Sequence, residues 1–139
     1  MGSANSQFQY DNASLPDDPV SFLETDEGLE WLEISSQRLA DGMDVTWRAR
    51  HGYQGVTVGD VAEAMACNTT YQEMLENWTV AYLRAKHDPG HAQKKQAIES
   101  DIRAICYAEA KSLLANLADD YAEHMRRESE IDAQLARAE

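Results

Sequence analysis

The sequence is an acidic chain of 139 residues, with 25 Asp and Glu against 12 Lys and Arg and a formal net charge of −13. Its length suits one domain, and a hydrophobic content of 43% is ordinary for a globular protein. No apolar run reaches the ~18 to 20 residues of a membrane span, and the first residues resemble no signal peptide. Cys67 and Cys106 lie in apolar helical settings and are expected to be buried, reduced thiols of a cytoplasmic protein.

Negative charge is concentrated at the start of the chain. Residues 1–37 contain eight acidic residues and no Lys or Arg, whereas the remainder is close to balanced. Such an arm is either a solubilising tail or a complement to a basic partner, such as a nuclease or a nucleic-acid-binding surface. Direct nucleic-acid binding through the arm is disfavoured, because phosphates are recognised by Lys and Arg.

The N-terminal residues predict an extended segment ahead of a folded domain. Residues 1–20 are polar and contain two X-Pro pairs, which favour extended or turn geometry. We therefore predict a flexible acidic lead at 1–20 and a single helical domain at 21–139. Gly2 followed by Ser6 matches the N-myristoylation pattern. The same start is a common vector remnant, and the sequence leaves both readings open.

The first half of the domain is predicted to be helical. Apolar spacing predicts a helix over about 27–41, ended by Gly42. Residues 56–58 have strand character, but Thr57 followed by Asp60 is more typical of a helix start, and no second convincing strand is found. Two further helices are predicted, at about 57–67 and 71–86, separated by a polar break. Of the three tryptophans, Trp31 and Trp78 are predicted to lie in the core and Trp47 to be at least half exposed.

The last 48 residues, 92–139, contain neither glycine nor proline and repeat apolar side chains at helical spacing. One unbroken helix of that length would span roughly 70 Å, against a radius of gyration of about 14 Å for a compact chain of this size. The segment must therefore bend, project or find a partner. Residues 116–120 are the predicted break, because Asn and Asp compete for helix caps. The predicted fold is an all-α bundle of four to five helices with a long C-terminal helical segment and an acidic, extended N-terminus.

The helices predicted at 57–67 and 71–86 resemble a helix-turn-helix. The resemblance implies a transcriptional regulator that dimerises through its C-terminal helices, with DNA contacts from Arg84, Lys86, Lys94 and Lys95. Glu73 and Glu76 lie on the second helix, where carboxylates would repel phosphates. A plain helical hairpin is therefore favoured over a DNA reader.

Several histidines and aspartates resemble the H…HD…D pattern of the HD family of metal-dependent phosphohydrolases, at His51, His87-Asp88, His91 and Asp119 or Asp120. The resemblance implies a divalent metal held by imidazoles and carboxylates that activates water. Pro89-Gly90 instead favours a surface turn at this point. No phosphate-binding glycine loop, nucleophile elbow or Cys–His pair at a catalytic spacing is present, so we predict a protein that is not an enzyme and has no metal or cofactor.

These features predict stoichiometric binding to another macromolecule. The chain would be a small acidic inhibitor, immunity protein or adaptor that covers a basic surface of a nucleic-acid-handling protein or complex. Phage- or plasmid-encoded inhibitors of host defence nucleases, including anti-CRISPR proteins, are similar in size and charge. A structural subunit of a larger assembly is a further alternative, and a homodimer is compatible with each. The carboxylates predicted to bind the partner are Glu24, Asp26, Glu27, Glu30, Asp60, Glu63, Glu73 and Glu76.

Overall fold

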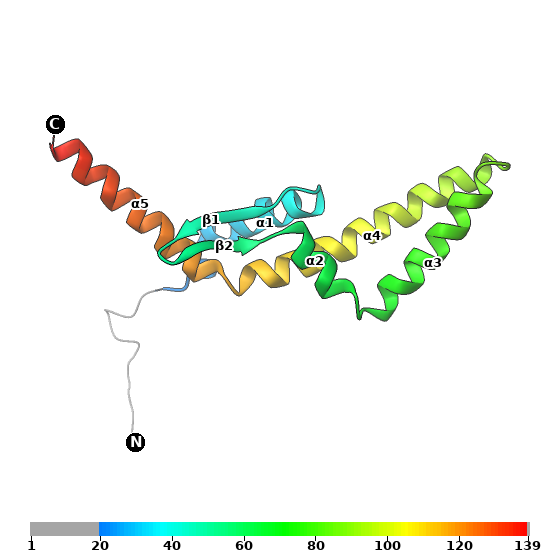
Figure 1. Ribbon diagram of the computed structural model, residues 1–139, viewed down its shortest axis with the longest axis horizontal. Coiled ribbons are helices and arrows are strands. Elements are labelled where there is room, and N and C mark those ends of the chain that lie inside the picture. The colour runs from blue at the N-terminus through cyan, green and yellow to red at the C-terminus, as the bar shows by residue number, and fades with distance from the viewer. Residues whose placement is uncertain (1–19, 139) are drawn as a thin grey trace, which may run out of the picture.

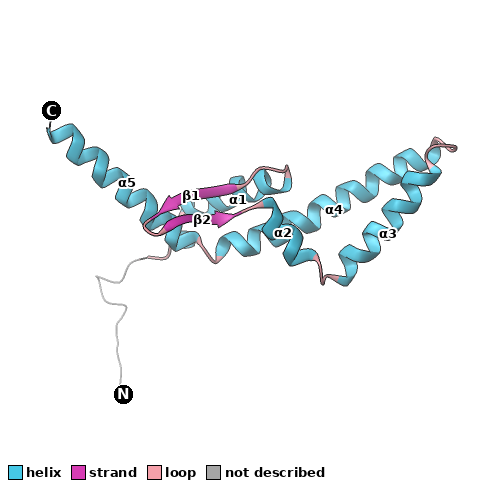
Figure 2. Cartoon of the chain, in the orientation of Figure 1, coloured by secondary structure: helices cyan, strands magenta, loops and turns pink. Residues whose placement is uncertain are grey.

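The computed structural model describes residues 20–138. The lead predicted at 1–20, apart from Val20, and the Gly2 motif lie outside the described residues. The elements in chain order are η1 (Phe22–Glu24), α1 (Asp26–Ala40), β1 (Val45–Ala49), β2 (Gly52–Val56), α2 (Val58–Met65), α3 (Thr69–Arg84), α4 (Gly90–Ala115) and α5 (Ala118–Ala138). Helices dominate the chain, with one small sheet (Figure 2), so the prediction of an essentially helical fold is confirmed.

The helix α4 is the spine of an elongated molecule (Figure 1). Its C-terminal half carries α1 and α2, and the β-hairpin lies beside them. Its N-terminal half pairs with α3, and these two helices form an arm that projects from one end of the body. At the opposite end α5 projects alone. Within the described residues no helix has the length and apolarity needed to cross a bilayer.

Residues that are local in the sequence define both ends of α1. The Gly28 N–H donates a hydrogen bond of 3.0 Å to Thr25 Oγ1, which caps the helix. At the other end Gly42 has a φ of +93°, and the Met43 N–H donates to the Arg38 carbonyl at 2.9 Å, as in a Schellman motif. The predicted helix at 27–41 and its end at Gly42 are confirmed.

The helix starts predicted in the middle of the chain are also confirmed. Thr57 forms a capping box with Asp60: the Asp60 N–H donates to Thr57 Oγ1 at 3.0 Å, and the Thr57 N–H donates to Asp60 Oδ2 at 2.9 Å. Asn68 then caps α3 by accepting the Tyr71 N–H at 2.9 Å. The long C-terminal segment breaks between Ala115 and Ala118, within the region predicted from Asn116 onward.

The β-hairpin corrects the prediction that the chain has no pair of strands. Its antiparallel strands are joined by two residues and pair Val45 with Val56. The sequence analysis missed it because β2 contains two glycines, which are usually depleted in strands. Gly55, at φ +131°, has a structural reason to be glycine: a Cβ there would collide with the backbone oxygen of Val45.

The same hairpin corrects the prediction for Trp47. Alternation along β1 turns Trp47 inward and its neighbour Arg48 outward. Trp47 is therefore only 6% exposed, although it was predicted to be at least half exposed. Trp31 and Trp78 are half-buried, and Trp31 packs against the core. Both cysteines were predicted to be buried. Cys67 instead lies exposed in the turn before α3, whereas Cys106 is half-buried, and this burial raises the pKa of its thiol.

The hydrophobic core lies where α1, α2 and β2 meet the C-terminal half of α4. Its buried members are few for a chain of this length: Leu32, Leu39, Val56, Val61, Met65, Ala110 and Leu114. Outside this region burial is sparse, since Ala81 is the one buried residue of α3. The core therefore supports the body, and both projecting ends lie outside it.

Polar contacts along one side hold α1 on α4. The Tyr107 hydroxyl donates to Glu33 Oε1 at 2.5 Å, and the Arg103 guanidinium contacts Asp41 Oδ1 at 2.8 Å. Hydrogen bonds from Tyr107 first, and then from Gln37, hold the pKa of Glu33 below its ordinary value. The same contact raises the pKa of the Tyr107 phenol.

Replacing Tyr107→Phe should raise the pKa of Glu33 toward its ordinary value, because the largest cause of its lowering is removed. A carboxyl whose folded-state pKa is lowered stabilises the fold above the unfolded value, about 4.3 for Glu. That stabilisation is lost as pH falls through the lower folded-state pKa. The variant should therefore lose less stability on acidification than the wild type. Carboxyl-carbon NMR titration of Glu33 checks this, and an unchanged Glu33 titration would contradict it.

Candidate functional site

The eight carboxylates predicted to bind a partner are all exposed, but the structure places them in three separate regions. Within residues 20–138 none of the eight forms an ion pair with Lys, Arg or His. The regions are the start of α1 with Glu24, Asp26, Glu27 and Glu30, the helix α2 with Asp60 and Glu63, and the first half of α3 with Glu73 and Glu76. Their negative charge is thus available to a partner, but from three regions of the molecule.

The first region lies at the end of the body from which α5 departs. The Phe22 N–H donates to Asp119 Oδ1 at 2.9 Å, which ties η1 to the start of α5. Asp26 and Glu27 occupy the first turn of α1, where the helix dipole favours negative charge. Because α1 runs antiparallel to α4 and ends at the Asp41–Arg103 contact near the middle of α4, this region lies beside the end of α4 and away from the arm (Figure 1). None of its four acids lines the pocket that contains Asp60 and Glu63. The structure therefore does not combine these four acids with the other four.

The second region borders an apolar groove between α2 and the end of α4. The groove has a volume of about 430 Å³. Apolar side chains from both sides line it, and two carboxylates stand on its rim: Val56, Ala64, Leu113 and Leu117, with Asp60 and Glu63. The capping box fixes where α2 begins, and so sets Asp60 and Glu63 at the rim. We call this feature the α2–α4 groove.

The sequence analysis identified the acidic residues of the α2–α4 groove but not its apolar wall. Asp60 and Glu63 were predicted as partner-binding residues, but Leu113 and Leu117 were known only as members of an apolar helical stripe. Leu113 lies near the end of α4, and Leu117 lies in the turn that follows it. The packing of α2 against that end of α4 then makes these side chains one wall of a groove.

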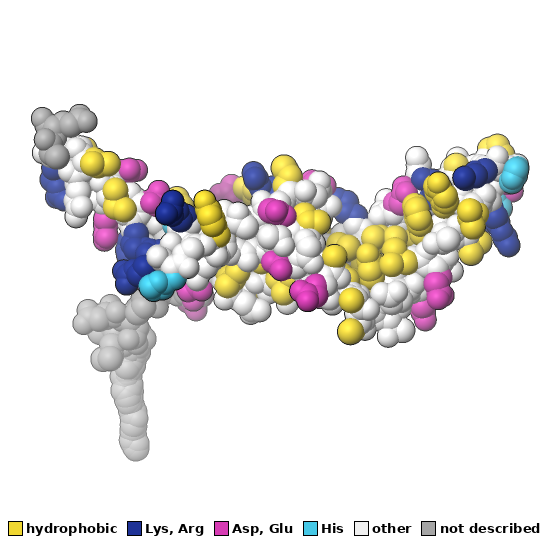
Figure 3. All heavy atoms as spheres, viewed as in Figure 1, with side chains coloured by type: hydrophobic (Ala, Val, Ile, Leu, Met, Phe, Trp, Pro, Cys, Tyr) yellow, Lys and Arg dark blue, Asp and Glu magenta, His cyan; other side chains and the backbone are white. Residues whose placement is uncertain are grey.

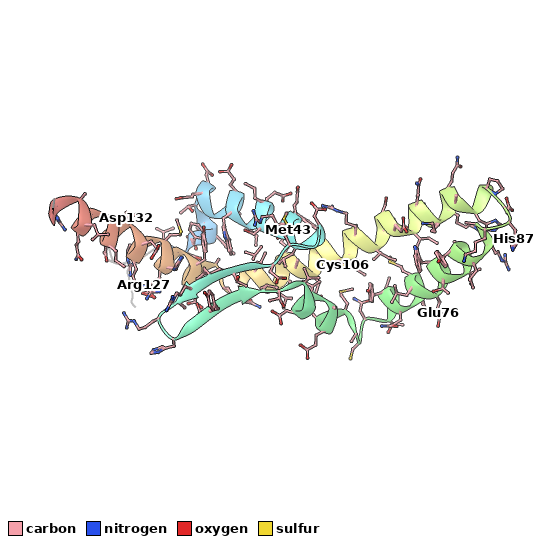
Figure 4. The ribbon with its side chains drawn as sticks, turned by 45° about the horizontal axis from the view of Figure 1, so that its top comes forward. Met43, Glu76, His87, Cys106, Arg127 and Asp132 are labelled. Carbon is pink, nitrogen blue, oxygen red and sulfur yellow. The ribbon has the colours of Figure 1, made fainter. Side chains whose placement is uncertain are left out.

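The third region continues the acidic surface onto the arm. Glu73 and Glu76 lie exposed on the first half of α3, where Figure 4 labels Glu76. From residue 57 to residue 77 the chain has four acids and no Lys or Arg. The helix α3 packs along α4 to form the arm, whereas α2 packs on α4 and α1. The helices predicted at 57–67 and 71–86 therefore do not form a hairpin with each other, because each packs on α4 instead. The bases of α3 lie only at the far tip, beyond the acidic half.

The residues of the phosphohydrolase-like pattern are spread along the molecule. His51 lies in the β-hairpin turn, and His87 lies at the tip of the arm (Figure 4). Asp119 lies at the start of α5, where it accepts a hydrogen bond from the Phe22 N–H. At the tip, His91 Nδ1 lies 3.0 Å from Asp88 Oδ2. Among residues 20–138 no group of three or more His, Cys, Asp or Glu is placed to hold a metal ion.

A small basic cluster forms where the β-hairpin turn meets α5. Arg50 and His51 line a pocket of about 300 Å³ together with Arg127. Asp120 and Glu123 line the same pocket, so its charges largely compensate each other. Figure 3 shows basic side chains gathered at this end, and Figure 4 labels Arg127 on α5. The α2–α4 groove, with its uncompensated carboxylates, is the better candidate for a binding site.

Comparisons of this chain with protein-family models, with curated proteins and with solved structures gave no significant match.

Proposed function

We propose that this chain is a stoichiometric protein-binding module, an inhibitor or adaptor that works by covering a basic surface of a nucleic-acid-handling partner. The observation that carries the proposal is the α2–α4 groove, an apolar groove with Asp60 and Glu63 on its rim. Within residues 20–138 neither carboxylate forms an ion pair, although Asp60 also accepts the Thr57 N–H. Such a groove suits an apolar side chain that has Lys or Arg as its neighbours. A nucleic-acid-binding surface supplies those bases.

Affinity and selectivity would come from different parts of this site. Burial of an apolar side chain contributes roughly 25 cal/mol per Å² of apolar surface removed from water. The rim carboxylates select a cationic partner and repel nucleic acid, whose phosphates carry the same sign of charge. The acids on α1 and on α3 do not line the groove. Those on α3 extend the acidic surface that a basic partner would meet, and both sets add to the field that speeds encounter with it.

The test is affinity capture at low salt from cells of the organism that encodes the chain, with wild type and matched variants in parallel. Glu63→Lys reverses a charge at the rim, and Ala64→Phe fills the groove without changing the charge. Glu130→Lys, on exposed α5, is the control for charge reversal alone. Wild type and control should capture the same nucleic-acid-handling protein, released by raising salt. Both groove variants should lose it.

Capture that survives both groove substitutions would show that the interface lies elsewhere, and recovery of nucleic acid alone would contradict a protein partner. Glu73→Lys combined with Glu76→Lys measures how far the interface extends along α3. That double variant should abolish capture while far-UV circular dichroism stays unchanged. Unchanged capture would restrict the interface to the groove itself.

A further inference from the structure

Two helical surfaces at opposite ends of the molecule lack a packing partner. The arm formed by α3 and α4 is only two helices thick, and Val80 and Leu83, which are spaced i, i+3 on α3, are 47% and 56% exposed. At the other end α5 contacts η1 and β1, and residues as far along as Ile131 still line a pocket beside the β-hairpin turn. Beyond Ile131 the helix projects from the body. Helical layers are stable when their apolar faces are buried against another element. Each end therefore has an apolar face without a cover.

The arm has a groove near its tip that fits an acidic helix. Val80, Ala81 and Ile98 give it an apolar floor, and its volume is about 390 Å³. Arg84 and Lys94, with His91, stand around this floor. We call this feature the arm groove.

The positive charge at the tip is only partly met within the arm. Lys95 Nζ lies 3.2 Å from Glu99 Oε2, whereas Arg84 and Lys94 form no ion pair among residues 20–138. Helix dipoles favour acids in the first turns of a helix and disfavour cations there. Yet α4 has no acid in its first turn, and Lys94 and Lys95 follow within its first two turns. Only Asp88 contributes negative charge between residues 84 and 95, against four Lys and Arg. This arrangement costs helix stability and is suited to a negatively charged segment bound at the tip.

The free half of α5 has the complementary properties. Ile131 and Leu135 are spaced i, i+4 on one face and are 50% and 61% exposed. Glu128 and Asp132 lie beside them on that face, and residues 128–135 contain no Lys or Arg. An isolated helix of this length is marginal in water. The face of Ile131 and Leu135 therefore matches the arm groove in shape, apolarity and charge.

Within one copy α5 does not reach the arm groove. Lys94 lies 21 residues before the end of α4, or about 32 Å along the helix. Leu135 lies 17 residues after the start of α5, or about 26 Å. Even folded straight back, α5 would leave Leu135 short of Lys94, and α1 and α2 already cover the adjoining part of α4. The occupant of the arm groove must come from another molecule.

We propose that the chain forms an antiparallel homodimer in which the free half of α5 of each copy packs into the arm groove of the other. In Figure 1, α5 and the arm slope away from the body toward the same side. A two-fold axis perpendicular to the view of Figure 1, placed outside the body on that side, turns each α5 toward the opposite arm and keeps the two bodies apart. The dimer contains the contact twice and closes on itself, and each arm becomes a three-helix layer with Glu128 and Asp132 facing Arg84 and Lys94 of the second copy.

The experiment measures the mass of the full chain in solution by light scattering or sedimentation up to about 100 μM, a range that detects weak dimers. Wild type should have twice the 15.6 kDa chain mass. Glu128→Lys with Asp132→Lys, and separately Arg84→Glu with Lys94→Glu, should weaken the dimer about 100-fold or more, because each makes like charges face each other. An equimolar mixture of the two double variants should recover the dimer, since every contact in the mixed pair is again between opposite charges. Glu130→Lys, on the opposite side of α5, should leave the dimer intact.

Four results would overturn the proposal: a monomeric wild type, a dimer indifferent to either double variant, double variants that stay monomeric when mixed, or filaments in place of a closed dimer. Circular dichroism of each variant separates loss of association from loss of folding. The proposal is independent of the function inferred for the α2–α4 groove. Glu63→Lys should leave the dimer unchanged. The dimer proposal and the proposed function of the groove can therefore fail independently of each other.

Discussion

Tyr121→Ala is expected to release α5 from the body and to lower the free energy of unfolding by about 2 to 4 kcal/mol. The Tyr121 ring stacks on Trp31, with ring centroids 4.6 Å apart and an interplanar angle of 18°. It meets Trp47 edge-on at 5.2 Å, and Phe22 lies 6.0 Å away. Since these rings come from η1, α1, β1 and α5, one truncation removes the centre of a cluster that joins four elements.

The measurement is urea unfolding followed by far-UV circular dichroism, with near-UV circular dichroism to report the packing of the tryptophans. Tyr53→Ala is the matched control. It removes the same side chain, but from a position on β2 where the tyrosine is 77% exposed. It should cost less than about 1 kcal/mol, as for an exposed cross-strand neighbour. Similar losses in the two variants would show that the cluster does not hold α5.

The helices could be predicted because their signals are local. Thr57 and Asp60 form a capping box within four residues, and Gly42 ends α1 through bonds that span only a few residues. The break after Ala115 falls in the predicted region, although the Asp119 carboxylate accepts the distant Phe22 N–H and caps neither helix. For the capping box and for Gly42, the interactions that decide the structure lie within the stretch that shows the pattern.

The β-hairpin and the burial of Trp47 could not be predicted in this way. Gly52 and Gly55 weaken the strand pattern of β2. Nothing near them in the sequence indicates the packing that compensates for these glycines and stabilises the strand. That compensation is tertiary: Trp47 joins the rings of Trp31 and Tyr121, the latter more than seventy residues away in the chain. A basic neighbourhood in the sequence suggested exposure, but strand alternation sends Arg48 outward and Trp47 inward.

The candidate site was predicted in part, for a similar reason. Charge counting identified Asp60 and Glu63 as exposed acids, and the structure leaves both at the surface. Charge counting could not show that Asp60 and Glu63 lie in a different region from Glu24 and Asp26. That difference depends on how α1 packs on α4, which a count of charges along the chain does not reveal. The apolar half of the groove depends on α2 meeting the last turns of α4, which is again a contact between distant segments.

Leu114→Ala is expected to have the largest effect of any single truncation considered, about 2 to 5 kcal/mol of lost stability. Leu114 is fully buried, at 0% exposure, in the cluster that contains Leu32 of α1 and Met65 of α2. Few other residues share that core, so a cavity there removes support from α1 and α2 together. Against a typical total of about 5 to 15 kcal/mol, such a loss brings the body close to unfolding.

The matched control is Leu29→Ala, the same change on α1 at a side chain that is 54% exposed. Its expected cost is below about 0.5 kcal/mol, since surface substitutions away from special features change stability little. Urea unfolding by circular dichroism should therefore separate the two variants by several-fold in lost stability. Because α1 and α2 lie on either side of Leu114, the variant should also weaken the α2–α4 groove and leave the arm helical. Equal costs for the two leucines would mean that α4 is not the spine on which the body is built.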